Sequence, residues 1–180
     1  MDTNRVEYVS GFAIVTASMK NELDSNRTRQ RITEIIRTVK DPAREYYELT
    51  GKPLGVTGEV AEFEASRLLD LSLCGARESG HDALRPPGVQ PMHVQIKGRR
   101  FIGQPNPGAR VGRIDIKNKA WDSVVLVFLN KRFEPEEVWE ASRAALEPAL
   151  AKPGSKARNE RGQLSISQFK AVGKQVWPTT

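Results

Sequence analysis

Six consecutive aliphatic or aromatic residues, Val124 to Leu129, place the strongest constraint on how this chain folds. The run is far shorter than the roughly 20 residues that a membrane-spanning helix needs, so the sequence predicts no membrane segment. With its neighbours Ser123 and Asn130 it has the length and composition of a strand that is buried on both faces. Such a strand requires a layer on each side of its sheet. We therefore expect a small central sheet flanked by helices.

Two other segments have the alternation of a half-buried strand. In Met92–Lys97 (MHVQIK), Met92, Val94 and Ile96 share one face and the polar residues between them share the other. Residues 113–117 (RIDIK) alternate in the same way and are predicted to form a further strand. Between these two segments, residues 103–112 are rich in glycine and proline and are expected to form a long turn.

Helical spacing and start signals account for most of the remaining chain. The predicted helices cover residues 19–39, 42–49, 58–71 with Thr57 as N-cap, and 135–150, with a last helix that is capped by Ser165 or Ser167 and carries Phe169, Val172 and Val176. Asp41–Pro42 is expected to separate the first two, because proline lacks the N–H that continues a helix. The sequence thus predicts one mixed α/β domain, in which residues 1–50 form a helical extension and residues 51–180 form the core.

The amino-acid composition favours a soluble globular protein and excludes disulfide-rich and zinc-finger proteins. The chain has 180 residues, of which 38% are hydrophobic and 28% charged, as in a soluble globular domain with a real core. The single cysteine, Cys74, excludes an internal disulfide. With only two histidines, it also excludes a zinc-finger type of Cys/His cluster. We expect a cytoplasmic protein, because disulfide-free chains are typical of reducing compartments.

Charge is distributed unevenly along the chain. Residues 85–133 carry ten basic and two acidic side chains, whereas residues 51–84 carry three basic and six acidic ones. A basic segment next to an acidic one suggests a polyanion held beside a carboxylate site. The charge distribution therefore predicts a polyanion such as a nucleic acid as the partner.

Three short segments carry the residue types of a metal-dependent hydrolytic site. Gln95 and Lys97 lie two apart and so project from the same face of their predicted strand. Asp82 precedes them by enough residues to lie on a neighbouring strand, and Glu59 lies in the first turn of the predicted helix 58–71. Oxygen ligands of this kind suit Mg²⁺, which stabilises charge on a phosphate and activates water.

This pattern resembles the PD-(D/E)xK superfamily of restriction-endonuclease-like nucleases, over roughly residues 55–130. Glu59 matches the acid on the first core helix, Asp82 the strand aspartate, and Gln95-Ile96-Lys97 the (D/E/Q)xK segment. Gln95 stands where Asp or Glu is commoner, and His81 stands where a proline usually precedes the aspartate. The order helix, hairpin, buried strand and helix 135–150 is also similar to the superfamily's αβββαβ core.

The resemblance implies the metal-dependent hydrolysis of phosphodiester bonds in DNA, and it implies a role for each of these residues. Asp82, Gln95 and the backbone carbonyl of Ile96 would bind Mg²⁺, for which Mn²⁺ is a substitute, and Glu59 would bind directly or through water. Lys97 would position the water that attacks phosphorus. The resemblance is also compatible with a homodimer, because many nucleases of this fold pair to cut both strands.

Basic residues surround the Lys97 strand and are predicted to contact the phosphates of the nucleic-acid backbone. They are Arg99, Arg100, Arg110, Arg113, Lys117 and Lys119. The alternative interpretation of this set is a solvated hairpin surface.

Several alternatives stay open at this point. Glu62 or Glu64 can replace Glu59 as the helix acid, because the sequence does not define the register of one helical turn. Asp82 has the alternative role of a turn residue, and His93 is either a solvated residue or a general base. At the level of the whole protein, the alternatives are a nuclease-fold protein that binds DNA without cutting it, and an interaction module whose basic patch meets an acidic protein.

Overall fold

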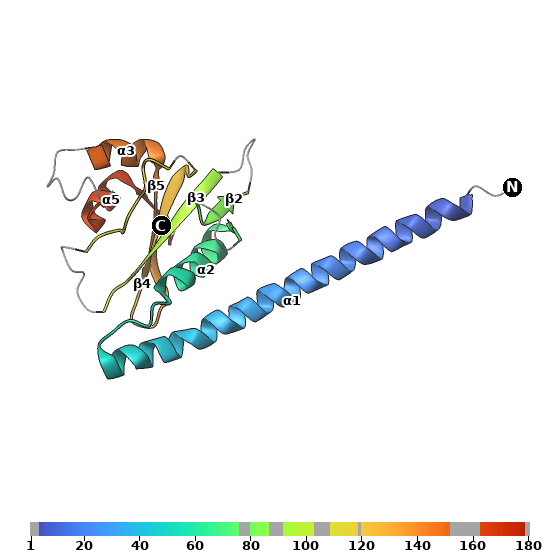
Figure 1. Cartoon of the computed structure of the whole chain (residues 1–180), viewed down its shortest axis with the longest axis horizontal. Coiled ribbons are helices and arrows are strands. Elements are labelled where there is room, and N and C mark those ends of the chain that lie inside the picture. Colours follow the sequence, from blue (N-terminus) through green and yellow to red (C-terminus); the bar gives the residue numbers. More distant parts are fainter. Residues whose placement is uncertain are drawn as a thin grey trace. The chain divides into compact units, whose positions relative to one another are not determined.

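The computed structural model describes residues 4–75, 80–86, 92–102, 109–118, 120–151 and 163–178, with the backbone alone for residues 4–21 and 23 (Figure 1). The chain divides into two units, Met1–Asp41 and Pro42–Thr180. Everything predicted for a catalytic site falls in the second unit. Among the residues described, no helix is both long and apolar enough to cross a membrane.

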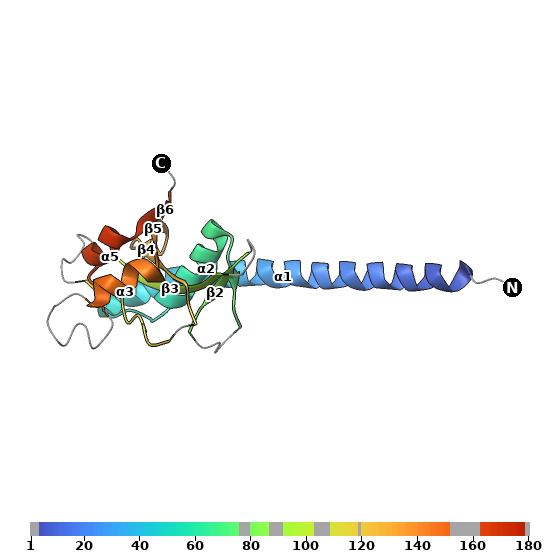
Figure 2. The same ribbon diagram turned by 90° about the horizontal axis from the view of Figure 1, so that it is seen from above.

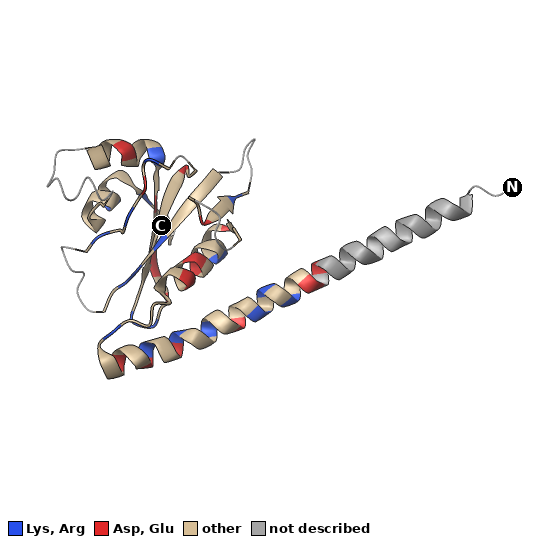
Figure 3. Cartoon of the chain, viewed as in Figure 1, with Lys and Arg blue, Asp and Glu red and all other residues tan. Residues whose placement is uncertain are grey.

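The N-terminal part of the chain is one helix, α1 (Asn4–Thr50). The predicted break at Asp41–Pro42 is wrong, since Pro42 lies inside this helix. Proline removes a single backbone hydrogen bond, and the neighbouring Ala43 is completely buried, so packing holds the chain in helical conformation there. Acidic and basic residues recur along the described part of α1 (Figure 3), and Arg31 and Glu34 form an ion pair of 3.0 Å there.

The second unit is built on one mixed sheet of six strands among the described residues. The strands are β1 (Ser72–Leu73), β2 (Ala83–Arg85), β3 (Met92–Arg100), β4 (Ser123–Leu129), β5 (Pro135–Ser142) and β6 (Lys174–Trp177). They lie in sequence order across the sheet. β3 and β4 are parallel, and every other neighbouring pair is antiparallel. The predicted α/β class, with a central mixed sheet and flanking helices, is confirmed.

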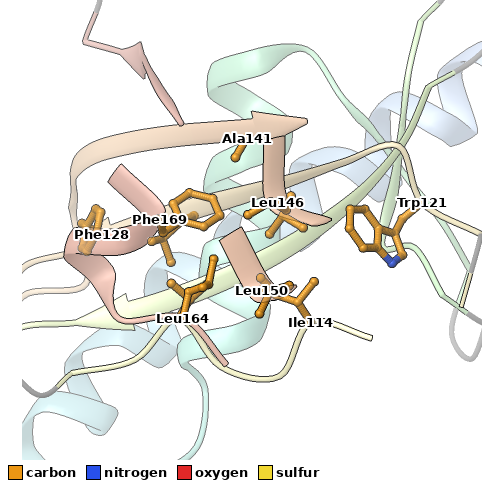
Figure 4. Packing of buried hydrophobic residues seen from close by; sticks show 11 residues of the cluster. Ile114, Trp121, Phe128, Ala141, Leu146, Leu150, Leu164 and Phe169 are labelled. Atoms are coloured by element: carbon orange, nitrogen blue, oxygen red, sulfur yellow. The ribbon is translucent and has the colours of Figure 1, made fainter. Parts of the chain in front are cut away.

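Strand β4 is the centre of the fold, as its apolar run predicts. Every residue from Ser123 to Leu129 is buried. On one side of it, Leu126 and Phe128 belong to a core cluster with Trp121, Leu146 and Phe169 (Figure 4). Helix α2 (Thr57–Leu69) covers the other side, and α3 (Arg143–Ala151) and α5 (Ile166–Val172) cover the cluster side (Figures 1 and 2).

The predicted strand at residues 113–117 is wrong. This segment belongs to the crossover from β3 to β4 and pairs with no strand. Its apolar alternation has another cause, because Ile114 is 1% exposed in the core cluster and Ile116 packs against that cluster. The indole Nε1 of Trp121 donates to the carbonyl of Asp115 over 3.0 Å, which holds the crossover against the sheet.

The predicted helix 135–150 is also wrong in its first half. Residues 135–142 form β5, and only Arg143–Ala151 is helical. A tight turn directs this strand back along β4: Phe133 N–H donates to Asn130 O over 3.0 Å, and Asn130 N–H donates to Glu134 O over 2.9 Å. Pairing along β4 then outweighs the local helical spacing, and Val138 and Ala141 are buried from the strand instead.

Two helix ends differ from the sequence predictions. Thr57 is the first residue of α2 rather than its N-cap, and the N-cap position, Val56, makes no side-chain capping bond. Ser165, rather than Ser167, caps α5 in a capping box with Gln168. Helix α5 ends at Val172, so Val176 lies in β6 and not in the helix.

These corrections bear on the expected αβββαβ core. The described chain has α2, the strands β1 to β3, and then β4 parallel to β3. Helix 135–150, which was matched to the second helix of that core, is instead β5 and α3. The α/β sheet is established, and the restriction-endonuclease-like core stays a prediction.

Candidate active site

A cavity of about 770 Å³ lies where α2, the residue directly before β2 and the second half of β3 meet. Its wall includes two carboxylates, Glu62 and Asp82, and the ammonium group of Lys97. The remaining polar wall is basic, with Arg99, Arg100 and Arg110, and the apolar wall includes Tyr47, Phe101 and Ile102. Acidic, basic and aromatic groups thus share one concave surface.

Backbone hydrogen bonds fix Asp82 beside β3. Its N–H donates to the carbonyl of Val94 over 2.9 Å, and its Oδ2 accepts from the N–H of Ile96 over 2.6 Å. The antiparallel register pairs Ala83 with Val94, so Asp82 stands opposite Gln95. The sequence-based expectation that Asp82 lies next to the Gln95–Lys97 segment is therefore met.

Lys97 lies close to both carboxylates of the cavity. Burial lowers the pKa of its ammonium group below the ordinary value, and Arg99 lowers it further, whereas Asp82 and Glu62 act in the opposite direction. Within the described part of the chain, Lys97 makes no ion pair shorter than 4.0 Å. Its three N–H donors are thus available to a molecule in the cavity.

The helix acid in the cavity is Glu62, and this corrects the assignment of Glu59. Glu59 is exposed and is not part of the cavity wall. Glu62 lies four residues after Gly58, on the same face of α2, and both line the cavity. Burial raises the pKa of Glu62, the negative charges of Asp82 and Glu59 raise it further, and Lys97 lowers it. Glu64, the other alternative, is buried and forms an ion pair of 2.9 Å with Arg67.

Gln95 and Ile96 complete the predicted metal ligands. Gln95 is half-buried and outside the cavity wall, and its Oε1 is buried without a hydrogen-bond partner in the structure. Ile96 lines the cavity, and its N–H is used by Asp82. A buried acceptor with no donor is costly, and a cation would satisfy it.

The oxygens of Glu62, Asp82 and Gln95 therefore fit Mg²⁺ in chemical type. They comprise two carboxylates and one amide. Among the described residues, no group of three or more His, Cys, Asp and Glu side chains is close enough to hold a metal ion.

The predicted phosphate-binding residues divide into two sets. Arg99, Arg100 and Arg110 line the cavity. Arg113 and Lys117 are exposed and are not part of its wall, and Lys119 lies outside the described residues. Arg113 lies instead 3.7 Å from Asp115.

Besides lining the cavity, Arg99 makes hydrogen bonds to two backbone carbonyl groups. Its Nε donates to the carbonyl of Arg110 over 2.5 Å, and its Nη1 donates to the carbonyl of Gly98 over 2.6 Å. Burial lowers the pKa of Arg99 below its ordinary value. The bond to Arg110 ties the backbone of the crossover between β3 and β4 to the end of β3.

The two histidines lie outside the cavity wall. Their rings approach each other edge to face, with centroids 4.4 Å apart, and His93 Nδ1 lies 3.3 Å from Asp122 Oδ2. The alternative role of His93 as a general base thus has no support from its position.

Sequence reasoning missed the two aromatic residues of the cavity. Tyr47 comes from the end of α1, distant in sequence from Asp82 and the β3 residues, and no local pattern indicates it. Phe101 directly follows the basic residues of β3 and could have been found by extending the alternation of that strand past Lys97.

Comparison with known proteins adds no assignment to this geometry. No model of a protein family matches the chain, and no curated protein matches it significantly.

Proposed function

We propose that this protein is a metal-dependent nuclease that hydrolyses phosphodiester bonds in DNA. The observation that carries the proposal is the joint presence of Glu62, Asp82 and Lys97 in one cavity whose wall also holds three arginines. Carboxylates alone would repel a phosphodiester, and arginines alone would bind it without a means of hydrolysis. Both sets together suit the binding and the cleavage of a phosphodiester.

In this proposal Mg²⁺ is held by Glu62, Asp82 and the amide oxygen of Gln95, with Mn²⁺ as a substitute. A bound divalent cation supplies charge stabilisation at phosphorus and lowers the pKa of a coordinated water. The bond from Ile96 N–H fixes one oxygen of the Asp82 carboxylate, which orients the group.

The other residues act on the water and on the phosphates. Lys97 donates a hydrogen bond to the attacking water or to the phosphate oxygen on which charge develops, for which its place in the same cavity as Glu62 and Asp82 is suited. Arg100 and Arg110 hold neighbouring phosphates. The protein acts in the cytoplasm in this proposal, and the homodimer stays a prediction of the resemblance.

The test is cleavage of native and heat-denatured DNA in Mg²⁺ and in Mn²⁺. Lys97→Met removes the charge and keeps the length of the side chain, and Asp82→Asn keeps an oxygen for the Ile96 N–H. Each is expected to lower the cleavage rate by at least about 100-fold. Lys117→Ala, an exposed cation outside the cavity, is the control and should cut at the wild-type rate. Cleavage by both site variants at the wild-type rate would refute the proposal.

One observation favours a second candidate function, in which the same cavity binds DNA without cutting it. Among the described residues, two carboxylates line the cavity, and the third oxygen proposed as a ligand belongs to the neutral Gln95. A gel-shift assay separates the two candidates. Retarded DNA that stays intact in both Mg²⁺ and Mn²⁺ would establish binding without catalysis.

A further inference from the structure

The cavity extends beyond the carboxylates to a second region, which is aromatic and basic. Strand β3 continues past Lys97 to Arg100, and Phe101 and Ile102 follow it along the cavity wall. Tyr47, from the end of α1, completes this region. Ile102 is 46% exposed, so part of this apolar wall faces solvent.

Aromatic rings hold the guanidinium of Arg100 in place. Its Cζ lies 4.1 Å from the ring centre of Phe133 and 5.3 Å from that of Tyr47, and its Nη2 donates to the carbonyl of Lys131 over 2.5 Å. The Nε of Arg100 is buried and has no hydrogen-bond partner in the structure. One donor of a well-positioned cation is therefore unsatisfied.

Arg110 presents a second unsatisfied donor. Its Nη1 is buried without a hydrogen-bond partner among the described residues, and its side chain is part of the cavity wall. The backbone around it is fixed: Val111 N–H donates to Leu164 O over 3.0 Å, and Ile166 N–H donates to Ala109 O over 3.2 Å. Buried donors without partners are costly, and an anion such as a phosphate would satisfy them.

We infer that the substrate of this cavity is single-stranded DNA, with an unstacked base against the Tyr47 and Phe101 rings and the adjoining phosphate on Arg110 and Arg100. The inference rests on the proposed function, since it specifies the substrate of the same site. In a duplex the faces of the bases are stacked on one another and cannot meet a protein ring. Only an unpaired nucleotide brings a base face and a phosphate together into a cavity, where base stacking on aromatic side chains is independent of sequence.

The experiment compares a short labelled oligonucleotide with the same strand annealed to its complement. Binding is measured by fluorescence anisotropy in EDTA, and cleavage is measured separately in Mg²⁺ and Mn²⁺. We expect the single strand to bind at least about tenfold more tightly than the duplex. Equal or tighter binding of the duplex would overturn the inference.

Two variants of one residue isolate the stacking contribution. Tyr47→Leu removes the ring and should lower single-strand affinity about tenfold while leaving duplex binding unchanged. Tyr47→Phe retains the ring and is the matched control, expected to bind as the wild type does. Phe101→Leu repeats the test on the second ring if Tyr47→Leu fails to fold. An equal loss for both forms of DNA would contradict the inference.

Failure of the nuclease proposal gives a different result. If the wild-type protein prefers the single strand in EDTA but cuts neither form with either metal, the nuclease proposal is refuted. The inference that the cavity binds single-stranded DNA is then supported. If the protein cuts the duplex at least as fast as the single strand, the nuclease proposal is supported. The inference that the substrate is single-stranded DNA is then overturned.

Discussion

Gly98 determines how closely α2 approaches the strand that carries Lys97. A β-carbon at this position would lie 2.6 Å from Ala61 Cβ and 2.7 Å from the carbonyl oxygen of Thr57. Neither neighbour can move freely, since one is fully buried and the other is backbone. Because Glu62 reaches the cavity from this helix, the same close contact also sets the distance between Glu62 and Lys97.

Gly98→Ala is therefore expected to destabilise the protein by about 1–3 kcal/mol, the usual cost of overpacking. Gly58→Ala is the control, because a β-carbon there meets nothing within 4 Å and alanine favours the helix. The free energy of unfolding in urea measures both. Equal stability of the Gly98 variant and the wild type would show that α2 does not pack as described.

A second prediction concerns the pH dependence that Glu62 introduces. Its pKa in the folded protein lies above the model-compound value of 4.5, so the folded state binds its proton more strongly than the unfolded chain does. Stability then falls as the pH rises from about 4.5 through that higher pKa, and the penalty persists at neutral pH.

Glu62→Gln removes this charge, and we expect its melting temperature to exceed that of the wild type at pH 8, with the difference vanishing near pH 4. Glu59→Gln is the control and should show no such gain, because Glu59 is exposed in the first turn of α2, where a negative charge suits the helix dipole. Thermal melts across this range measure the effect. A lower melting temperature for Glu62→Gln at pH 8 would contradict the electrostatic account of the cavity.

At this scale, the alternation along one strand and the spacing from Asp82 to Gln95 were enough to predict that Asp82 lies beside the Gln95–Lys97 segment. They were not enough to choose the helix acid. Glu59 and Glu62 are one turn apart, and only the packing of α2 on Gly98 decides which of them faces the cavity. The sequence offers no signal for Tyr47, because its position depends on a contact with residues far along the chain.

Among the elements, α5 shows how local chemistry defines a boundary. Ser165 Oγ accepts from Gln168 N–H over 3.2 Å, and the Gln168 side chain accepts from the Ser165 N–H over 3.0 Å. Both bonds are local in sequence, and for this reason a cap at Ser165 or Ser167 was predictable without the fold.

Ser165→Ala is expected to cost about 1 kcal/mol of stability, since it removes the cap. Ser167→Ala leaves the bonds to Gln168 in place and should have a much smaller effect. Urea midpoints compare the two variants. A larger loss at Ser167 than at Ser165 would mean that the helix begins elsewhere.

Other elements were not predictable from local pattern. Residues 135–142 have apolar spacing that suits a helix, and they become β5 because the turn at Asn130 directs them along β4. Residues 113–117 alternate like a strand, yet they lie in a crossover, where Ile114 is buried in the core cluster and no described strand pairs with them. In α1, burial of Ala43 keeps the helix continuous through Pro42. In each case long-range packing decided between two conformations that the local sequence permits.

For the whole molecule, the β4 run and the alternation in β3 were sufficient for an α/β sheet with helices on both faces. The order of the six strands and the parallel pairing of β3 with β4 were not, because both depend on a crossover that no local pattern encodes. The positions of the basic side chains were also only partly predictable. The basic segment was visible in the sequence, but the fold alone separates the arginines of the cavity wall from the exposed Arg113 and Lys117.

The central claim is that Glu62, Asp82 and Gln95 hold a divalent cation beside Lys97. A crystal of the full chain soaked in Mn²⁺ tests it directly through anomalous scattering. The account predicts a peak about 2–2.5 Å from the carboxylate oxygens of Asp82 and Glu62, which is lost in Asp82→Asn. A soaked crystal with no peak in this cavity, or with the same peak in Asp82→Asn, would contradict it.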